Sequence, residues 1–284
     1  MPFAEIDGIN TRYEVVGEGP PILMYAPGGF NAHLGQWTDL GIYARVKLLD
    51  HLPKKYQCII FDRRENGESG GRVEAVGWQH FVRQGAGLLD YLGIEKAHLL
   101  GGCMGCPPVT AFGVAHPERV LSMLLFWPVG GAKYRINCHL RFARHIAYVA
   151  ENGLKAVVDL VRSHEENFSQ DPRGGPWTNS IRSSGDFAEA YATLDPDTYR
   201  MTVSAMVRGL FDRDTAPGAE AEELLALDIP SIIVPGADDA HARSAAMYLH
   251  ECLTGSEFVD IRPREQSEEN VPLRVVDFLD GVRT

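Results

Sequence analysis

Apolar strand-like runs alternate with helix-like runs along most of this 284-residue chain, and this alternation limits the fold more than any other feature. Strands that alternate with helices pair in parallel, and the helices then cover both faces of the sheet. We therefore expect an α/β fold with a mostly parallel central sheet. The expected strands are residues 3–6, 11–16, 21–25, 57–61, 97–100, 120–126, 229–234 and 257–261. The expected helices are residues 37–52, 77–92, 107–116, 219–227 and 242–253, with a last helix that ends near residue 282.

The alternation stops between residues 133 and 214. This stretch is rich in helix formers, arginine and aromatic residues, with one loop-like interruption at residues 171–176. We interpret it as a helical cap inserted into a core made of residues 1–132 and 215–284. The cap then shapes any pocket at the edge of the sheet.

The strongest chemical signal is a Gly-x-Cys-x-Gly run with Cys103 at its centre. It follows an apolar strand and precedes a helix, which predicts a sharp turn that lifts the Cys103 side chain at the helix N-terminus. Glycines flank the cysteine because a β-carbon at either position would crowd the turn. Backbone N–H groups and the helix dipole favour the thiolate, which is the reactive form of cysteine. We expect Cys103 to be a nucleophile.

Charge and cysteine content restrict the partners and the compartment. A formal net charge of −11 argues against nucleic acid and anionic membranes as partners. No apolar run reaches the ~18 residues of a membrane span, and the N-terminal residues lack the pattern of a secretory signal. The five scattered cysteines are typical of reduced thiols in a cytoplasm. We expect a cytoplasmic protein that acts on a small molecule without a metal or another cofactor. Whether it forms a homodimer stays open.

Several motifs, taken in order, resemble the α/β-hydrolase superfamily over essentially the whole chain. The segment 62–69 is similar to the Asp-x-Arg-x-x-Gly-x-Ser motif of the esterase, epoxide hydrolase and carbon–carbon hydrolase branches. Residues 27–30, Pro-Gly-Gly-Phe, resemble the oxyanion loop, although a His-Gly pair is usual there. Residues 236–239 resemble the Gly-x-x-Asp loop of the catalytic acid, and residues 265–269 with 275–279 resemble the closing helix. The resemblance implies an α/β-hydrolase fold with a helical cap. A cysteine nucleophile is similar to that of the dienelactone hydrolases, which act on small carboxylated lactones.

The resemblance also implies roles for individual residues. The oxyanion hole is expected from the backbone N–H groups of Met104 and of Gly29 or Phe30. Asp239 fits the offset of the acid that orients an imidazole, whereas Asp238 is expected to cap the turn.

Two further residues are expected to bind substrate. One of the neighbouring arginines, Arg63 and Arg64, is expected to support its own loop. The other, assigned as Arg64, is expected to bind a substrate carboxylate through its guanidinium group. His33, which follows the oxyanion loop, is expected to face the pocket.

The resemblance breaks at the catalytic histidine. In the superfamily it lies just before the segment that corresponds to residues 265–269, but no histidine follows His250. Three interpretations stay open. His241, two residues after Asp239, supplies the imidazole; or Cys103 acts without a strong base; or the chemistry is lost and the pocket only binds a ligand. Cys103 and Cys106 also form a Cys-x-x-Cys pair, for which a redox role is a further alternative.

The function expected from these residues is hydrolysis of an ester, lactone or thioester, or of a carbon–carbon bond, in a small carboxylated substrate. A ligand-binding protein without turnover is one alternative. A lyase or decarboxylase-like enzyme that uses the pocket for proton chemistry is another.

Overall fold

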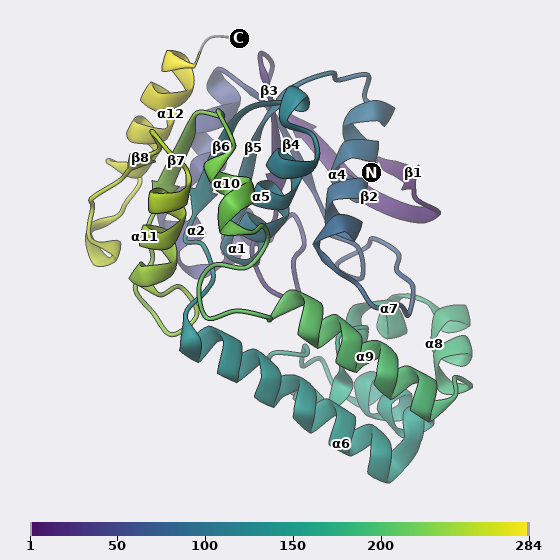
Figure 1. Cartoon of the computed structure of the whole chain (residues 1–284). Coiled ribbons are helices and arrows are strands. Elements are labelled where there is room, and N and C mark those ends of the chain that lie inside the picture. Colours follow the sequence, from purple (N-terminus) through teal and green to yellow (C-terminus); the bar gives the residue numbers. More distant parts are fainter. Residues whose placement is uncertain (1, 283–284) are drawn as a thin grey trace.

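The computed structural model describes residues 2–282, in which eight strands form one sheet (Figure 1). The strands are β1 (Phe3–Ile6), β2 (Ile9–Val16), β3 (Pro21–Tyr25), β4 (Gln57–Phe61), β5 (Ala97–Gly102), β6 (Val120–Phe126), β7 (Ser231–Val234) and β8 (Glu257–Phe258). Their order in the sheet is β1-β2-β4-β3-β5-β6-β7-β8. The β1–β2 and β2–β4 pairs are antiparallel, and all other pairs are parallel. The predicted mostly parallel α/β sheet is confirmed.

Helices cover both faces of this sheet. One face packs against α4 (Trp78–Tyr91), α5 (Cys106–Ala115), α10 (Ala221–Leu225) and α11 (Arg243–Cys252). The other face packs against α1 (Gln36–Asp39), α2 (Gly41–Val46), α3 (Leu48–His51) and α12 (Val271–Gly281).

The sequence of β3 explains why both faces are buried. Side chains alternate between the faces of a strand. Leu23 and Tyr25 accordingly lie in one apolar cluster, and Ile22 and Met24 lie in the other. All four are completely buried, so the strand reads as a continuous apolar run rather than as an alternating one.

Two expected elements differ from the structure. The helix expected at residues 37–52 is broken into α1, α2 and α3, because Gly41 and Lys47 both adopt positive φ values, 41° and 54°. The last strand pairs over only two residues, Glu257 and Phe258, although the amide of Val259 still donates to Ile233. Neither change moves the sheet edge at which the site lies.

The segment 133–214 holds four helices that lie together at one end of the sheet, below the core in Figure 1. They are α6 (Ala132–Ser163), α7 (Thr178–Ser183), α8 (Gly185–Ala192) and α9 (Pro196–Leu210). The long α6 is interrupted at Gly153, where φ is 77°. Phe30 of the core packs edge-on against Phe142 and Phe168, so the apolar interior of this layer is continuous with that of the core. Within residues 2–282, no helix has the length and apolar character needed to cross a membrane.

Candidate active site

Cys103 lies on a strained turn between β5 and α5. Its φ is 52°, a left-handed value that is uncommon for a residue with a side chain. The flanking glycines make this turn sterically feasible. A β-carbon on Gly101 would lie 2.4 Å from the carbonyl oxygen of Gly105, and one on Gly105 would lie 2.2 Å from that of Tyr25. The turn presents the half-buried Cys103 side chain to a cavity at the carboxyl edge of the sheet.

Cys106, the other cysteine of the Cys-x-x-Cys pair, points away from this cavity. It is buried, and its thiol donates hydrogen bonds to the carbonyl oxygens of Gly101, at 3.1 Å, and Phe126, at 3.6 Å. Both cysteines are free thiols. The two side chains therefore lie in different environments, and only Cys103 meets the cavity.

His241 is the imidazole beside Cys103. It lies in the loop after β7, which is attached to the end of β6 by a backbone bridge between Gly130 and His241. Its ring packs against Trp127, with ring centroids 5.4 Å apart. Nδ1 is 2.8 Å from Oδ1 of Asp238, and the buried Nε2 has no partner within residues 2–282 other than the Cys103 sulfur. Because Asp238 requires Nδ1 to carry a proton, Nε2 of the neutral ring is free to accept one from Cys103.

The acid next to His241 is Asp238, and the expectation for Asp239 was wrong. Oδ1 of Asp238 also accepts the backbone N–H groups of Ala240 and His241, and these bonds fix its carboxylate towards the ring. Asp239 instead forms an exposed ion pair with Lys133, at 2.8 Å. Successive side chains in this tight turn point in different directions, so an offset in the sequence does not select the acid. No spacing in the sequence distinguishes these two neighbouring aspartates.

Three pKa shifts describe the electrostatics of this group. Burial raises the pKa of Cys103, but the charge and hydrogen bond of His241 and the amides of Gly28 and Met104 outweigh it and bring the pKa to about 7. Burial lowers the pKa of His241, yet the Cys103 thiolate and Asp238 raise it to about 10. The hydrogen bond from His241 holds the pKa of Asp238 at about 2, against the effect of burial. A thiolate–imidazolium pair is therefore favoured near neutral pH.

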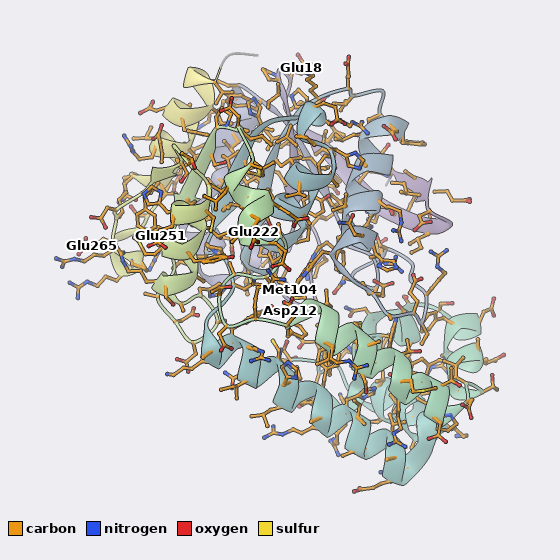
Figure 2. The ribbon with its side chains drawn as sticks, in the orientation of Figure 1. Glu18, Met104, Asp212, Glu222, Glu251 and Glu265 are labelled. Atoms are coloured by element: carbon orange, nitrogen blue, oxygen red, sulfur yellow. The ribbon has the colours of Figure 1, made fainter. Side chains whose placement is uncertain are left out.

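The expected oxyanion residues, Gly29, Phe30 and Met104, all line the cavity beside Cys103. In addition, the amide of Gly28 forms a hydrogen bond to the Cys103 sulfur, as does that of Met104. Sequence reasoning missed Gly28. Gly28 and Gly29 have φ values of 110° and 52°, which explains why two glycines are needed in this loop. In Figure 2, Met104 lies where the core meets the cap.

Arg63 braces the oxyanion loop against the elbow. Its fully buried guanidinium donates hydrogen bonds to the carbonyl oxygens of Met104 and Gly29. It also lies 5.3 Å from the ring centroid of Phe81. Arg63 is thus the supporting member of the arginine pair.

Arg64 and His33, which were expected to bind substrate, do not line the cavity beside Cys103. Arg64 is buried and bonded to the carboxylates of Glu65 and Glu74, and it does not line the cavity beside Cys103. The ring of His33 is bonded to Gln36 at 2.9 Å and lies outside the lining of that cavity. Neither guanidinium is available to a substrate there, because Arg64 is engaged by Glu65 and Glu74 and Arg63 by two backbone carbonyls.

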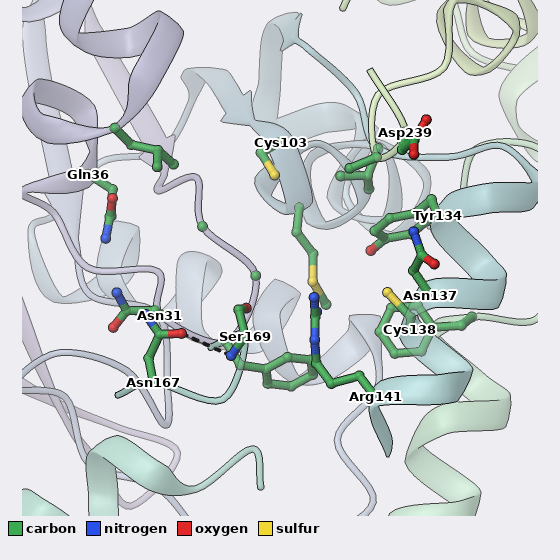
Figure 3. A pocket seen from close by; sticks show the side chains of 18 residues that line it. Asn31, Gln36, Cys103, Tyr134, Asn137, Cys138, Arg141, Asn167, Ser169 and Asp239 are labelled. Atoms are coloured by element: carbon green, nitrogen blue, oxygen red, sulfur yellow. Dashed lines mark hydrogen bonds between the residues drawn. The ribbon is translucent and has the colours of Figure 1, made fainter. Parts of the chain in front are cut away.

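The cavity beside Cys103 has a volume of about 390 Å³ and lies between core and cap (Figure 3). Arg141 is its one cationic side chain, and it has no ion-pair partner within residues 2–282. Sequence reasoning missed Arg141. The core contributes Gly28, Gly29, Phe30, Asn31, Gln36, Leu40, Cys103, Met104, Val129, Asp239 and Ala240. The cap contributes Tyr134, Asn137, Cys138, Arg141, Asn167, Ser169 and Phe211.

One group of side chains within residues 2–282 has the spacing of metal ligands, and it lies in the cap, not in this cavity. It consists of His164, Glu166 and Asp171. The carboxylate of Asp171 already accepts hydrogen bonds from Nε and Nη2 of Arg173, which makes it a poor metal ligand.

A buried glutamine, Gln266, follows the loop of residues 260–264, where the resemblance led us to expect a histidine. Gln266 accepts a hydrogen bond from Nε1 of Trp127, at 2.7 Å, and donates to the carbonyl oxygens of Pro235 and Ile261. Since Trp127 packs on His241, Gln266 supports the position of the His241 ring.

Comparisons with known proteins agree with this architecture. A family model described as alpha/beta hydrolase fold matches residues 21–128. A 2-hydroxy-6-oxo-6-phenylhexa-2,4-dienoate hydrolase of Comamonas testosteroni is 34% identical over 55% of this chain and 49% of its own length. An acetyltransferase component of the acetoin cleaving system of Cupriavidus necator is 32% identical over 45% of this chain and 32% of its own length. The chain thus spans a third to a half of the length of these two relatives.

Solved structures match over nearly the whole chain. The enol-lactonase from Burkholderia xenovorans LB400 has a TM-score of 0.62 at 19% identity, with 98% of this chain and 100% of that chain covered. A thermophilic esterase from Thermogutta terrifontis has a TM-score of 0.66 at 20% identity, with both chains covered completely. Together with the sheet order and the elbow, these matches show that the chain has the α/β-hydrolase fold.

Proposed function

We propose that this protein is a hydrolase that cleaves an ester, lactone or thioester of a small carboxylated substrate through a covalent bond to Cys103. One observation carries the proposal: a cysteine with φ of 52° faces a cavity beside the Asp238–His241 pair and two backbone amides. The similar proteins include a hydrolase, an enol-lactonase and an esterase, which is consistent with the proposal.

In the first step the Cys103 thiolate attacks the substrate carbonyl carbon. A carbon–sulfur bond forms, and the electron pair of the carbonyl bond moves onto its oxygen. The backbone N–H groups around Gly29 and Met104 stabilise this oxyanion, and each such donor typically contributes about 10²–10³ in rate. The intermediate then collapses, the bond to the leaving group breaks, and the His241 imidazolium gives its proton to that group.

In the second step water releases the acyl group. His241 is now neutral, and its Nε2 accepts a proton from water, which attacks the acyl carbon of the thioester bond to Cys103. The thiolate leaves, and the carboxylic acid is released. Asp238 stays ionised throughout, because its pKa of about 2 lies far below neutral pH, and it holds the ring in the required tautomer.

The carboxylate of the substrate is assigned to Arg141 in place of Arg64. Arg141 has no acidic partner in the described chain, and Asn137 lies one helical turn before it on the same cavity wall. In Figure 3 its guanidinium points into the cavity from below, whereas Cys103 enters from above. A guanidinium binds a carboxylate through two parallel hydrogen bonds, which orients the substrate as well as holding it.

The proposal is tested with p-nitrophenyl butyrate and the variants Cys103→Ala and Cys103→Ser. We expect the wild type to release p-nitrophenolate and to gain the mass of one butyryl group at Cys103 before steady state. Cys103→Ala should lose both signals. Turnover that survives in Cys103→Ala would contradict the nucleophile role. Fast alkylation of Cys103 by iodoacetamide without hydrolysis of any ester would favour a binding protein instead.

A further inference from the structure

Tyr134, in the first turn of α6, lines the cavity and carries a hydroxyl group that the described residues leave poorly satisfied. The residue is only 8% exposed and lines the cavity, and its ring packs edge-on against Phe211. Its hydroxyl is buried without a hydrogen-bond partner within residues 2–282. The Cys138 thiol interacts with this hydroxyl, but sulfur is a weak acceptor and satisfies it poorly. An unpartnered buried hydroxyl costs free energy, and a substrate oxygen in the cavity would remove that cost.

The position of Tyr134 in the cavity places it on the side where we expect the leaving group of the substrate. In Figure 3, Tyr134 lies on the same side of Cys103 as Asp239, away from Asn31 and Gln36. The oxyanion loop is on the Asn31 side, so the carbonyl oxygen is directed there. The bond that breaks therefore points to the opposite side. α6 begins two residues after Gly130, which pairs with His241, so this side also holds the proton donor.

We infer that the Tyr134 hydroxyl donates a hydrogen bond to the leaving-group oxygen, and that the substrate is an oxygen ester or lactone rather than a thioester. The inference rests on the proposed function. When the intermediate collapses, the carbon–oxygen bond breaks, His241 transfers its proton to the departing oxygen, and Tyr134 stabilises the negative charge that develops on it without losing its own proton. A leaving sulfur gains little from this donor, since sulfur is a weak acceptor and a thiolate departs without such help.

Two properties of Tyr134 support a role as donor. Burial, with the charges of Cys138 and Cys103 added, raises its pKa well above the usual range, so the hydroxyl stays protonated at every working pH. The second property is the position of Tyr134 on the cap. A cap side chain is able to interact with the leaving group while the core supplies the nucleophile and the oxyanion hole.

The test compares phenyl butyrate with S-phenyl thiobutyrate, which share one acyl group and differ in one atom. We expect Tyr134→Phe to lower kcat/KM for phenyl butyrate by about tenfold or more. The value for the thioester should change by less than about twofold. Because the variant removes only an unpartnered hydroxyl, its midpoint of thermal unfolding should be unchanged or higher. The matched control is Tyr148→Phe on the same helix, whose ring lies beneath Arg173 and outside the cavity.

The outcomes separate this inference from the proposed function. Equal losses for both substrates would place the donor on the carbonyl oxygen and overturn the inference, as would no loss for either. A lowered unfolding midpoint for Tyr134→Phe would mean that the hydroxyl is structural, which also overturns it. A wild type that acquires no acyl group at Cys103 from either ester contradicts the proposed function itself.

Discussion

The core and the cap contribute to the cavity in different ways. The core supplies backbone geometry: the strained turn at Cys103, the paired glycines of the oxyanion loop and the short loop that joins Asp238 to His241. The cap supplies side chains that stand on a regular helix, such as Tyr134 and Arg141. Substitutions in the core should therefore affect the turnover of every substrate, whereas substitutions in the cap should affect the turnover of only some substrates.

The largest effect is expected in the acid–base loop of the core. His241→Ala should lower kcat/KM for p-nitrophenyl butyrate by about 10²–10⁴-fold, the usual contribution of general acid–base catalysis. Asp238→Asn should reproduce much of this loss because the ring loses its orienting carboxylate. Asp239→Asn should stay within about twofold of the wild type, since its partner Lys133 belongs to the exposed start of α6. Steady-state kinetics measure these values. If kcat/KM fell as far in Asp239→Asn as in Asp238→Asn, the assignment of Asp238 as the acid would be contradicted.

Two glycine-to-alanine changes compare the backbones of core and cap. Gly105→Ala should lower the free energy of unfolding by about 3 kcal/mol or more, because the new β-carbon would collide with the carbonyl of Tyr25. Gly209 lies at an exposed position of α9, and a β-carbon there would meet nothing within 4 Å, so Gly209→Ala should raise the free energy of unfolding by about 0.5–1 kcal/mol. Urea unfolding measures both. A Gly105→Ala variant as stable as the wild type would mean that the elbow relaxes easily, and the contrast between the regions would disappear.

Arg141→Gln is the matching test on the cap. We expect kcat/KM for p-nitrophenyl hemisuccinate, which carries a free carboxylate, to fall by about 10–100-fold, the value of one or two charged hydrogen bonds. The value for p-nitrophenyl butyrate should not change. Arg141→Lys should recover part of the loss because it keeps the charge without the paired donors. Losses of equal size for both esters would instead give Arg141 a general structural role.

The smallest change is a shift along the pH axis. The folded pKa of Cys103 lies below the ordinary thiol value of 9.0, so the thiolate forms as the pH rises through about 7 and persists above it. The rate of iodoacetamide alkylation at Cys103 should follow this midpoint, and Asp238→Asn should move it upward by weakening the imidazolium. Cys138 of the cap provides the contrast, because burial raises its pKa to about 12 and it should not react. A midpoint near 9 for Cys103 would contradict the ion pair.

The elements that sequence reasoning predicted are those with a local cause. The buried strands and the elbow follow from apolar runs and from glycines that a β-carbon would displace, as at Gly101 and Gly105. The choice between Asp238 and Asp239 depends on a turn whose side-chain directions no spacing rule gives. Likewise, Arg63 and Arg64 differ only in which carbonyl or carboxylate lies next to each after folding.

The side of the cavity formed by the cap could have been predicted from the sequence. Tyr134, Cys138 and Arg141 follow one another at intervals of four and three residues, which places them on one face of a helix. This face carries a hydroxyl, a thiol and a guanidinium group, and polar groups on a face that packs against the core indicate the wall of a cavity. The sequence does not predict how this helix face lies against the loop of Gly28, because the two are more than a hundred positions apart.

Four consecutive residues, 238 to 241, contain both the carboxylate and the imidazole. In relatives of the usual design these two groups sit on separate loops, so their alignment depends on how two distant strands end. In this chain one Asx turn sets the spacing of the two groups, and Trp127 together with the bridge to Gly130 fixes the ring from outside the turn. The segment before the closing helix α12 therefore acts on the ring through a single bond, the one from Trp127 to Gln266.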